Sequence, residues 1–595
     1  MSKINLVIVK TKYNDRIYRK LAIIMPEGYF DPDFIKTIKS VNIKVNGRVW
    51  NPKLKAWLIN FTVQAIESTI AAFLDSSMMD QSIIRSLIKE LKKAKKQIIQ
   101  TATIKIKNQC ILYPFTRVAA QIPNFYQKIR ELIGFKHPAE RQIRQYSRKD
   151  LSIWDGRIVE VDYSYKKNNM IFDIGYLDKI INFLKQNNIK VNIIDKRGEF
   201  LGLSESPDIN SFNDLDKVEH QFNINFYPEQ KDAIEIILNT LYADGHCLYQ
   251  FPTGLGKTEI AMSIIQILNI RTIILVNRKD LLYQWKNRME TKLKIKAGII
   301  GDGKFDLQPI TVATVQSLWS YIKSHLDISS KNLEQLHKFI NTGKIEVDSA
   351  PITNTKLFEY FSLVILDEVH IGAADTFLHV LRRFTAKYYL GQSATTWRTD
   401  GFHPLLWGIF GKPVYKYRLK NAVDKGYLVE PIVQLVDTGF RVPKNIQRYN
   451  SGKKELKYNP DRNELITEIV KDAEKPAIIF TGEITHQKEI SRYLKNANID
   501  HITANGNTSS EQRQQILEQI RNNEIDIAIL TPIWDEGVDV PCLSSVLLVF
   551  PGRSDVKLIQ RIGRGIRKSK GKSKCFIYDF VIVPTSVGVY QHKLP

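Results

Sequence analysis

Cysteine is scarce in this sequence. Only four occur among 595 residues, and no two of them form a Cys-x-x-Cys pair: Cys110, Cys247, Cys542 and Cys575. This spacing argues against a zinc site and against a disulfide-stabilised scaffold. Free, scattered thiols are typical of proteins from a reducing cytoplasm, and we expect that compartment.

Long apolar runs are also missing. No stretch approaches the roughly 18 uninterrupted apolar residues that a membrane-spanning helix needs, and the N-terminus does not resemble a secretory leader. We therefore expect neither secretion nor a membrane partner.

Acidic residues are in deficit. The 62 Asp and Glu residues are outnumbered by 86 Lys and Arg, which gives a formal charge of +24. Such an excess favours a polyanionic partner, either nucleic acid or an anionic surface, although a merely soluble basic protein stays an alternative. With 43% apolar and 25% charged residues, the chain can bury several cores, and its length suggests several domains.

Two small units are expected before the main body of the chain. Residues 1–80 predict an α+β domain, in which alternating residues around Asn51-Pro52 indicate a hairpin. Residues 81–205 open with a Lys-rich amphipathic helix, interpreted as a connector rather than a binding arm. They continue as a second α/β unit with a helix near 176–186 and a strand near 191–194. The polar stretch 204–216 indicates a linker.

Beyond residue 217, short apolar runs alternate with helical patterns in two sets. The runs lie at 272–276, 310–313, 363–366 and 388–390, and then at 477–480, 525–530 and 546–550. Continuous apolar strands separated by helices are typical of parallel sheets covered on both faces. We predict an α/β fold with two such lobes, 217–410 and 411–595, and an insertion at 323–356.

The segment 251–258 reads Phe-Pro-Thr-Gly-Leu-Gly-Lys-Thr and lies between an apolar run and a helical pattern. It departs from the phosphate-loop pattern only at Phe251, where a first glycine is usual. The backbone at Thr253, Gly254 and Gly256 would curl around the phosphates of a nucleotide. Lys257 would neutralise the outer phosphates, and Thr258 would hold Mg²⁺. A chance glycine-rich turn is the alternative.

Two polar clusters follow predicted strands of the first lobe, where open α/β sheets bind ligands. Asp367 is expected to hold Mg²⁺ and Glu368 to orient and deprotonate the attacking water, although a solvated acidic turn would look alike. Ser393 and Thr395 follow the next strand and could connect the ATP site with the second lobe, with a simple polar turn as the alternative.

A basic segment, 560–567, closes the second lobe and reads Gln-Arg-Ile-Gly-Arg-Gly-Ile-Arg. A helix would place Arg564 and Arg567 one turn apart on one face, where both can stabilise the charge of a transferring phosphoryl group. A DNA-facing or solvated basic helix is the alternative. Upstream, Gly537 permits a close backbone approach and Asp539 could orient the arginines.

The order of the motifs PTGLGKT, DEVH, SAT, TPIWDEGVDVP and QRIGRGIR over residues 220–585 resembles the superfamily 2 helicases and translocases. The resemblance implies two RecA-like lobes, ATP and Mg²⁺ as cofactors, and Gln560 as part of the catalytic arginine motif. It also implies that Gln230 contacts adenine. Residues 277–279 and 314–318 resemble the strand-contacting motifs of the first lobe, and 480–482 with Thr531 resemble their counterparts in the second.

Within the superfamily the chain is most similar to the XPB-like group and to phage helicases of the UvsW type. Residues 397–400, Trp-Arg-Thr-Asp, resemble a charged tripeptide of the XPB-like group, with Thr399 in place of its central acid. Residues 154–157, Trp-Asp-Gly-Arg, resemble a DNA-binding domain that precedes the motor in UvsW-type proteins. The hairpin with Trp50 and Trp57 resembles the HARP-type module of annealing helicases, although both tryptophans also suit a core. This group of relatives favours a prokaryotic or phage-infected cell.

Together these features predict an ATP-driven motor on DNA. The resemblance implies branched substrates, with fork regression, branch migration, annealing or R-loop unwinding in recombination, replication and repair, and with RNA as a partner in RNA–DNA hybrids. An RNA helicase and the motor subunit of a restriction system are alternatives. A non-hydrolysing binding module is disfavoured by the full set of Lys257, Asp367, Glu368, Arg564 and Arg567.

Overall fold

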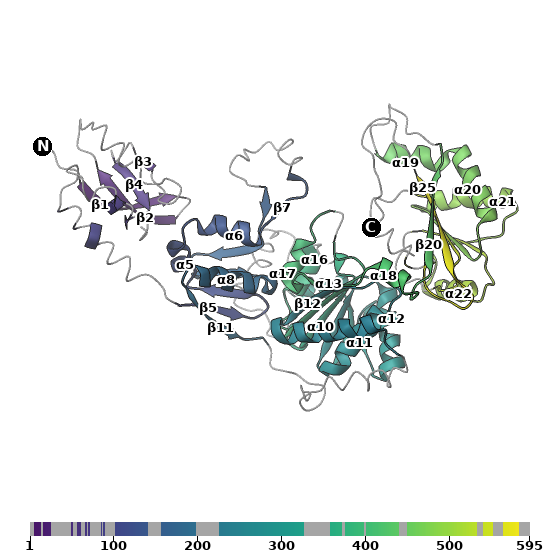
Figure 1. Ribbon diagram of the computed structural model, residues 1–595, viewed down its shortest axis with the longest axis horizontal. Coiled ribbons are helices and arrows are strands. Elements are labelled where there is room, and N and C mark those ends of the chain that lie inside the picture. The colour runs from purple at the N-terminus through teal and green to yellow at the C-terminus, as the bar shows by residue number, and fades with distance from the viewer. Residues whose placement is uncertain are drawn as a thin grey trace. The chain divides into compact units, whose positions relative to one another are not determined.

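The computed structural model describes part of the chain. The described residues are 5–13, 16–24, 49–51, 56–60, 66–67, 69–71, 82, 85, 87–89, 101–140, 156–197, 225–325, 357–371, 375–397, 400–439, 449–531, 540–550, 563 and 565–581. They belong to two compact units, Met1–Arg197 and Gly198–Pro595. Figure 1 labels the elements of each unit.

The first unit begins with a small antiparallel sheet in the order β1-β2-β4-β3. Its strands are β1 (Asn5–Tyr13), β2 (Arg16–Ile24), β3 (Val49–Asn51) and β4 (Ala56–Asn60). The predicted hairpin is present, because β3 pairs antiparallel with β4 and places Trp50 opposite Trp57. Trp57 is half-buried, which agrees with a packing role for this residue.

The second part of this unit has a five-stranded sheet in the order β11-β5-β6-β10-β9. The strands are β5 (Thr101–Ile106), β6 (Cys110–Tyr113), β9 (Val161–Ser164), β10 (Asn169–Phe172) and β11 (Lys190–Asp195). Helices α5 (Phe115–Gln121), α6 (Phe125–Ile133) and α8 (Leu177–Gln186) share a core with its alternate residues, such as Ala102, Ile104 and Ile106. The helix and strand predicted near 176–186 and 191–194 are thus confirmed as α8 and β11. Trp154 and Asp155 lie outside the described residues.

The first lobe of the second unit is built on an eight-stranded sheet in the order β15-β14-β16-β13-β17-β18-β12-β19. All strand pairs are parallel except β14 with β15. The strands are β12 (His246–Gln250), β13 (Thr272–Val276), β14 (Gly298–Gly301), β15 (Lys304–Asp306), β16 (Ile310–Thr314), β17 (Leu363–Asp367), β18 (Tyr388–Ser393) and β19 (Pro413–Lys416). Every residue of β13, β16 and β17 is buried, as expected for a parallel sheet covered on both faces.

The connections between these strands are mostly helical. They are α10 (Pro228–Asp244), α11 (Lys257–Leu268), α12 (Lys279–Arg288), α13 (Val315–His325), α16 (Asp375–Leu381) and α17 (Pro404–Phe410). The apolar faces of α10 and α11 pack into the same core as β12 and β13. Of the predicted insertion, residues 326–356 lie outside the described part of the chain.

The boundary expected between the two lobes, at 410, falls before the last strand of the first sheet. β19 pairs parallel with β12, with Leu248 opposite Pro413 and Gln250 opposite Lys416. The first lobe therefore extends at least to Lys416. Its sequence does not indicate a strand, because the segment is short, begins with proline and alternates between half-buried and exposed residues.

The second lobe has a six-stranded, wholly parallel sheet in the order β20-β25-β24-β21-β23-β22. Its strands are β20 (Glu430–Asp437), β21 (Ala477–Phe480), β22 (Ile502–Ala504), β23 (Ile527–Leu530), β24 (Ser545–Leu548) and β25 (Lys574–Val581). The helices that follow β19 are α18 (Leu419–Asp424), α19 (Tyr449–Tyr458), α20 (Pro460–Asp472), α21 (Ile484–Asn496) and α22 (Ser510–Arg521). The α/β prediction of two parallel-sheet, RecA-like lobes is confirmed.

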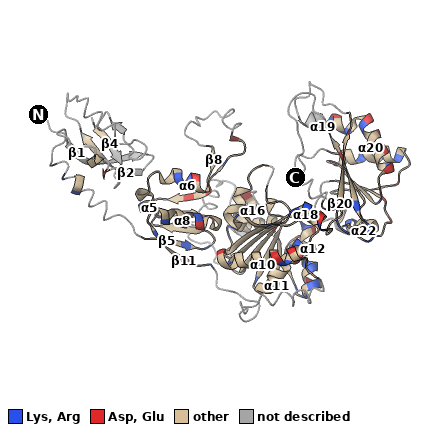
Figure 2. Ribbon diagram, in the orientation of Figure 1, with Lys and Arg blue, Asp and Glu red and all other residues tan. Residues whose placement is uncertain are grey.

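Two properties of the described residues bear on partners. None of their helices combines the length and the apolar character needed to cross a bilayer. Lysine and arginine occur on elements of both units and are interspersed with acidic residues (Figure 2). The basic excess of the sequence is therefore not confined to one described element.

Candidate active site

The phosphate loop connects β12 to α11, as its sequence predicts. Gly254 and Gly256 have φ values of +87° and +81°, in the left-handed region that favours glycine. Gly256 is also the N-cap of α11, and a Cβ built there would lie 2.5 Å from Nε2 of Gln230. Free backbone N–H groups at the start of α11 therefore face the loop, which is the arrangement that binds phosphate.

Phe251, the departure from the usual loop pattern, has a structural explanation. It is buried, and its ring stacks on Tyr417 with centroids 5.3 Å apart and lies 6.3 Å from Tyr415 of β19. The aromatic side chain thus packs the beginning of the loop against the strand that extends the sheet. A glycine at this position would leave that space unfilled.

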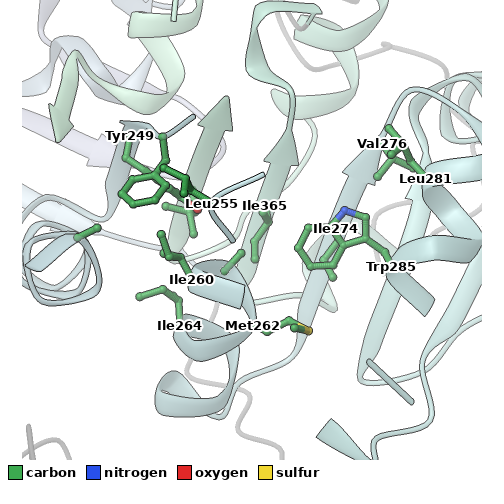
Figure 3. Packing of buried hydrophobic residues seen from close by; sticks show 14 of the residues in the cluster. Tyr249, Leu255, Ile260, Met262, Ile264, Ile274, Val276, Leu281, Trp285 and Ile365 are labelled. Carbon is green, nitrogen blue, oxygen red and sulfur yellow. The ribbon is translucent and has the colours of Figure 1, made fainter. Parts of the chain in front are cut away.

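The phosphate loop packs against a hydrophobic core. Tyr249 and Leu255 lie beside Ile260 and Ile264 of α11, and Ile274 of β13 lies near Trp285 of α12 (Figure 3). Because these side chains interdigitate at high density, the loop and the two helices are held in a fixed geometry.

Gln230, expected to contact adenine, is buried near the start of α10. Its Oε1 accepts a hydrogen bond from the backbone N–H of Tyr227 at 2.8 Å, and its Nε2 donates to the carbonyl of Leu255 at 2.9 Å. The side-chain amide therefore joins the segment before α10 to the phosphate loop. One N–H and one lone pair of the amide remain for a base.

Asp367 ends β17, and both of its carboxylate oxygens accept hydrogen bonds. Trp285 Nε1 donates to Oδ2 at 2.8 Å, and Gln392 Nε2 donates to Oδ1 at 2.9 Å. The amide oxygen of Gln392 in turn accepts from the Tyr249 hydroxyl at 2.5 Å. These donors fix the plane of the Asp367 carboxylate.

Glu368 adopts a left-handed backbone with φ of +57°, which is uncommon for a residue with a side chain. Its Oε1 lies 3.8 Å from Lys257 Nζ, and its Oε2 accepts from Ser393 Oγ at 3.0 Å and lies 3.3 Å from His370 Nδ1. The Ser393 oxygen also accepts the backbone N–H of Thr395 at 3.1 Å. The structure therefore brings together Lys257, Glu368 and Ser393 from three separate motifs.

The two neighbouring carboxylates have opposite pKa shifts. Burial raises the pKa of Asp367, and the adjacent Glu368 carboxylate raises it further, against the effect of the Trp285 and Gln392 hydrogen bonds. Burial also acts to raise the pKa of Glu368, but the Lys257 ammonium and the His370 hydrogen bond outweigh it and lower the pKa. Glu368 is therefore ionised at neutral pH and can accept a proton from water.

The residues present fit a magnesium ion that is shared with bound phosphates. Asp367 supplies carboxylate oxygens, and Thr258, the second residue of α11, supplies a hydroxyl oxygen. Two adjacent acids, the buried Asp367 and the half-buried Glu368, make the potential here negative, which a cation would offset. Among the described residues, no group of three or more His, Cys, Asp or Glu side chains forms a dedicated metal site. Mg²⁺ commonly takes one or two protein ligands and completes its shell with phosphate and water.

Arg567 reaches the phosphate loop from the second lobe. A Cβ built on Gly254 would lie 3.0 Å from Cγ and 3.2 Å from Nε of Arg567, and one built on Gly563 would lie 3.0 Å from Cβ of Thr253. The basic segment and the phosphate loop are thus in contact. Four other predicted site residues lie outside the described part of the chain: Gly537, Asp539, Gln560 and Arg564.

The crossover segment, which we define as residues 425–429, contacts both lobes. Toward the first, Lys425 pairs with Glu229, and the Tyr427 ring stacks on Tyr227 with centroids 4.0 Å apart. Toward the second, the Val429 N–H donates to the Ile566 carbonyl at 2.9 Å, and Leu428 forms an antiparallel bridge with Arg567. The backbone that presents Arg567 is therefore bonded to the segment beside Gln230.

Sequence reasoning missed several residues of this site. It gave no role to Trp285, Gln392 or Tyr249, and it did not single out the crossover segment. Trp285 fits the apolar face of an amphipathic helix, so periodicity alone interprets it as core. Gln392 stands within a polar cluster after a strand, and that position was the only available signal.

Comparison with known proteins agrees with this geometry. Residues 223–398 match the family model "Type III restriction enzyme, res subunit", and residues 461–569 match "Helicase conserved C-terminal domain". The DNA 3'-5' translocase XPB2 of Sulfurisphaera tokodaii is 27% identical over 388 residues, which cover 58% of this chain and 81% of that protein. Putative helicase 22 of Sulfolobus islandicus filamentous virus is 26% identical over 391 residues, which cover 61% of this chain and 64% of the relative.

The crystal structure of T4 UvsW aligns with 82% of this chain and 93% of its own length, at 18% identity and a TM-score of 0.35. The two domain models, the relatives and the order of motifs in one ATP site lead to a single assignment. The chain is an ATP-hydrolysing helicase of superfamily 2 and is similar to proteins of its XPB-like group.

Proposed function

We propose that this helicase is a motor that translocates along DNA and acts on branched DNA. The observation that carries the proposal is the contact between Arg567 and the phosphate loop at Gly254. A nucleotide on that loop would touch elements of both lobes, so that its binding and hydrolysis change how the lobes engage each other. Alternate gripping of a strand by the two lobes would then advance the protein.

The residues have distinct roles in hydrolysis. Lys257 neutralises the outer phosphates, Glu368 accepts a proton from the attacking water, and Arg567 stabilises charge on the transferring phosphoryl group. Ser393 and His370 orient Glu368 through their contacts with its Oε2. Thr258 and Asp367 would hold Mg²⁺, which when bound screens the negative charge of the phosphates. Arg564, Gln560, Gly537 and Asp539 are proposed partners of Arg567.

DNA is the proposed track because the whole chain carries a charge of +24 and because the XPB2 relative is named a DNA translocase. Strand contacts are assigned to residues 277–279 and 314–318 of the first lobe and to 480–482 and Thr531 of the second. Contacts with phosphates do not depend on the base sequence, and they make binding strongly dependent on salt.

Selectivity for branched DNA is assigned to residues 1–205, with a HARP-like domain at 1–80 and a UvsW-like domain at 81–205. Both parts contain described sheets of their own, separate from the motor. The proposed processes are fork regression, branch migration, annealing and R-loop unwinding, in which RNA–DNA hybrids also occur. The proposed compartment is the cytoplasm of a prokaryotic or phage-infected cell.

The proposal is tested by measuring ATP hydrolysis with different polynucleotides at fixed salt. We expect forked and four-way DNA to stimulate hydrolysis more than linear duplex or single strands. Stimulation by RNA alone would contradict the DNA assignment and favour an RNA helicase. Equal stimulation by linear and branched DNA would remove the proposed selectivity but leave the motor.

A further inference from the structure

Trp285 contacts the site from an unexpected direction. It lies in the middle of α12, is 2% exposed, and donates its indole N–H to Asp367 Oδ2 at 2.8 Å. The other oxygen of Asp367 accepts from Gln392 on β18. The carboxylate is therefore held by two donors on two different elements, and only the Trp285 donor belongs to a helix that also reaches other parts of the unit.

Helix α12 has connections at both of its ends. It begins directly after Asn277 and Arg278, which we assign to strand contacts. Near its start, Asp280 Oδ2 accepts from Arg513 Nη1 of α22 in the second lobe at 3.2 Å. Near its end, Arg288 lies 3.5 Å from Oε1 of Glu259, which follows Thr258 on α11. Helix α12 is thus bonded to the second lobe and to the phosphate-loop helix α11, and it directly follows residues that we assign to contacts with the DNA strand.

We propose that Trp285 is a positioning residue that ties the orientation of Asp367 to helix α12. Through it, engagement of a DNA strand at 277–279 changes how well Asp367 binds Mg²⁺ with the nucleotide. The part of this inference that concerns DNA rests on the proposed function. The part that concerns Asp367 does not.

The physical basis is the geometry of one buried hydrogen bond. A shift of α12 by about 1 Å would lengthen the 2.8 Å bond beyond hydrogen-bonding range. Because the indole is buried among apolar side chains near Ile274 (Figure 3), water does not readily replace the lost partner. Asp367 would then keep only the Gln392 donor and could rotate about that bond. The orientation of the Asp367 carboxylate would therefore depend on the position of α12.

The test compares Trp285→Phe with the parent protein. Phenylalanine keeps much of the apolar volume but lacks the N–H. We expect the affinity for a fluorescent non-hydrolysable ATP analogue to fall by about 10- to 100-fold in the presence of Mg²⁺, the range seen when partners of metal ligands are removed. Affinity in EDTA should be unchanged. We also expect DNA to stimulate ATP hydrolysis less in the variant than in the parent.

Tyr283→Phe is the matched control, because it removes a hydroxyl-to-carboxylate hydrogen bond from the same helix, to Asp302, away from Asp367. It should match the parent in both nucleotide-binding measurements, with Mg²⁺ and in EDTA. If Trp285→Phe does not fold, the tryptophan isostere 3-benzothienylalanine at position 285 removes the N–H and keeps the shape of the ring.

The outcomes separate the inference from the function on which it partly rests. Unchanged Mg²⁺-dependent binding in a folded Trp285→Phe protein would overturn the positioning role. Weaker Mg²⁺-dependent binding with normal DNA stimulation would overturn the connection to the strand. Failure of DNA to stimulate even the parent protein would instead contradict the proposed function and leave the Asp367 result to be judged by nucleotide binding alone.

Discussion

Lys257 is the only cation in the phosphate loop 251–258, and its ammonium is held 3.8 Å from Glu368. Because no other loop residue can neutralise the phosphates, Lys257→Ala should reduce ATP turnover by at least about a hundredfold. Binding of DNA should be nearly unchanged, since the strand contacts are assigned elsewhere. Steady-state hydrolysis and DNA-binding titrations check both expectations.

Lys471→Ala, at an exposed position near the end of α20, is the control for loss of one positive charge. It should hydrolyse ATP at the parental rate. Parental turnover in Lys257→Ala would mean that ATP is hydrolysed at some other site.

At the residue scale, the sequence predicts the motif residues of the site better than it predicts the side chains that hold them in place. Lys257, Glu368 and Arg567 belong to motifs whose residue types indicate their chemical roles. In the structure, Glu368 lies beside Lys257, and Arg567 contacts the phosphate loop. The hydrogen bond from Trp285 to Asp367 joins residues 82 positions apart. Such a contact depends on how α12 packs on the sheet, which residue spacing along the chain does not encode.

At the element scale, helices α20 and α21 enclose two buried basic side chains. Arg462 donates to the carbonyl of Val549, and neither ring nitrogen of His486 has a hydrogen-bond partner within the described residues. Burial, together with the nearby positive charges of Arg462 and Lys457, lowers the pKa of His486 to about 3. The folded lobe therefore keeps this imidazole neutral.

The lowered pKa predicts a loss of stability in mild acid. The unfolded chain binds a proton on His486 below about pH 6.5, whereas the folded chain binds it only near pH 3, so stability is present above pH 6.5 and falls as the pH drops. At pH 5 the cost of this one group is about 2 kcal/mol. His486→Met, which does not titrate, should show a smaller loss of unfolding free energy between pH 7.5 and pH 5. Denaturant unfolding at the two pH values measures this, and an identical pH dependence in both proteins would contradict the prediction.

The strands illustrate which elements can be predicted from sequence. Runs such as 272–276 and 477–480 are continuous in apolar residues because the sheet buries both of their faces. β19 has no such run, since it lies at the edge of its sheet and keeps one face accessible. β19 belongs to the sheet because it pairs with β12, which lies more than 160 residues earlier in the chain.

At the scale of the whole molecule, the N-terminal and motor units have separate cores. Deleting residues 1–205 should therefore leave a folded motor with its basal ATP hydrolysis. The preference for branched over linear DNA should be lost, because the selectivity is assigned to the deleted part. Hydrolysis measured with linear, forked and four-way DNA compares the truncated and full-length proteins.

A truncated motor with the full-length substrate preference would move the selectivity to the insertion at 323–356 or to the lobes themselves. Complete loss of basal hydrolysis in a soluble, folded truncation would show instead that the N-terminal unit supports the ATP site.

The crossover segment has one more consequence. Its Tyr427 ring stacks on Tyr227, three residues before Gln230, which is proposed to contact adenine, and its backbone is hydrogen-bonded to the stretch that carries Arg567. If Gln230 contacts adenine as proposed, we expect substitutions there to alter both the discrimination between purine nucleotides and the rate of hydrolysis. Evolutionary changes in these five residues would therefore be expected to change nucleotide preference and the rate of hydrolysis together.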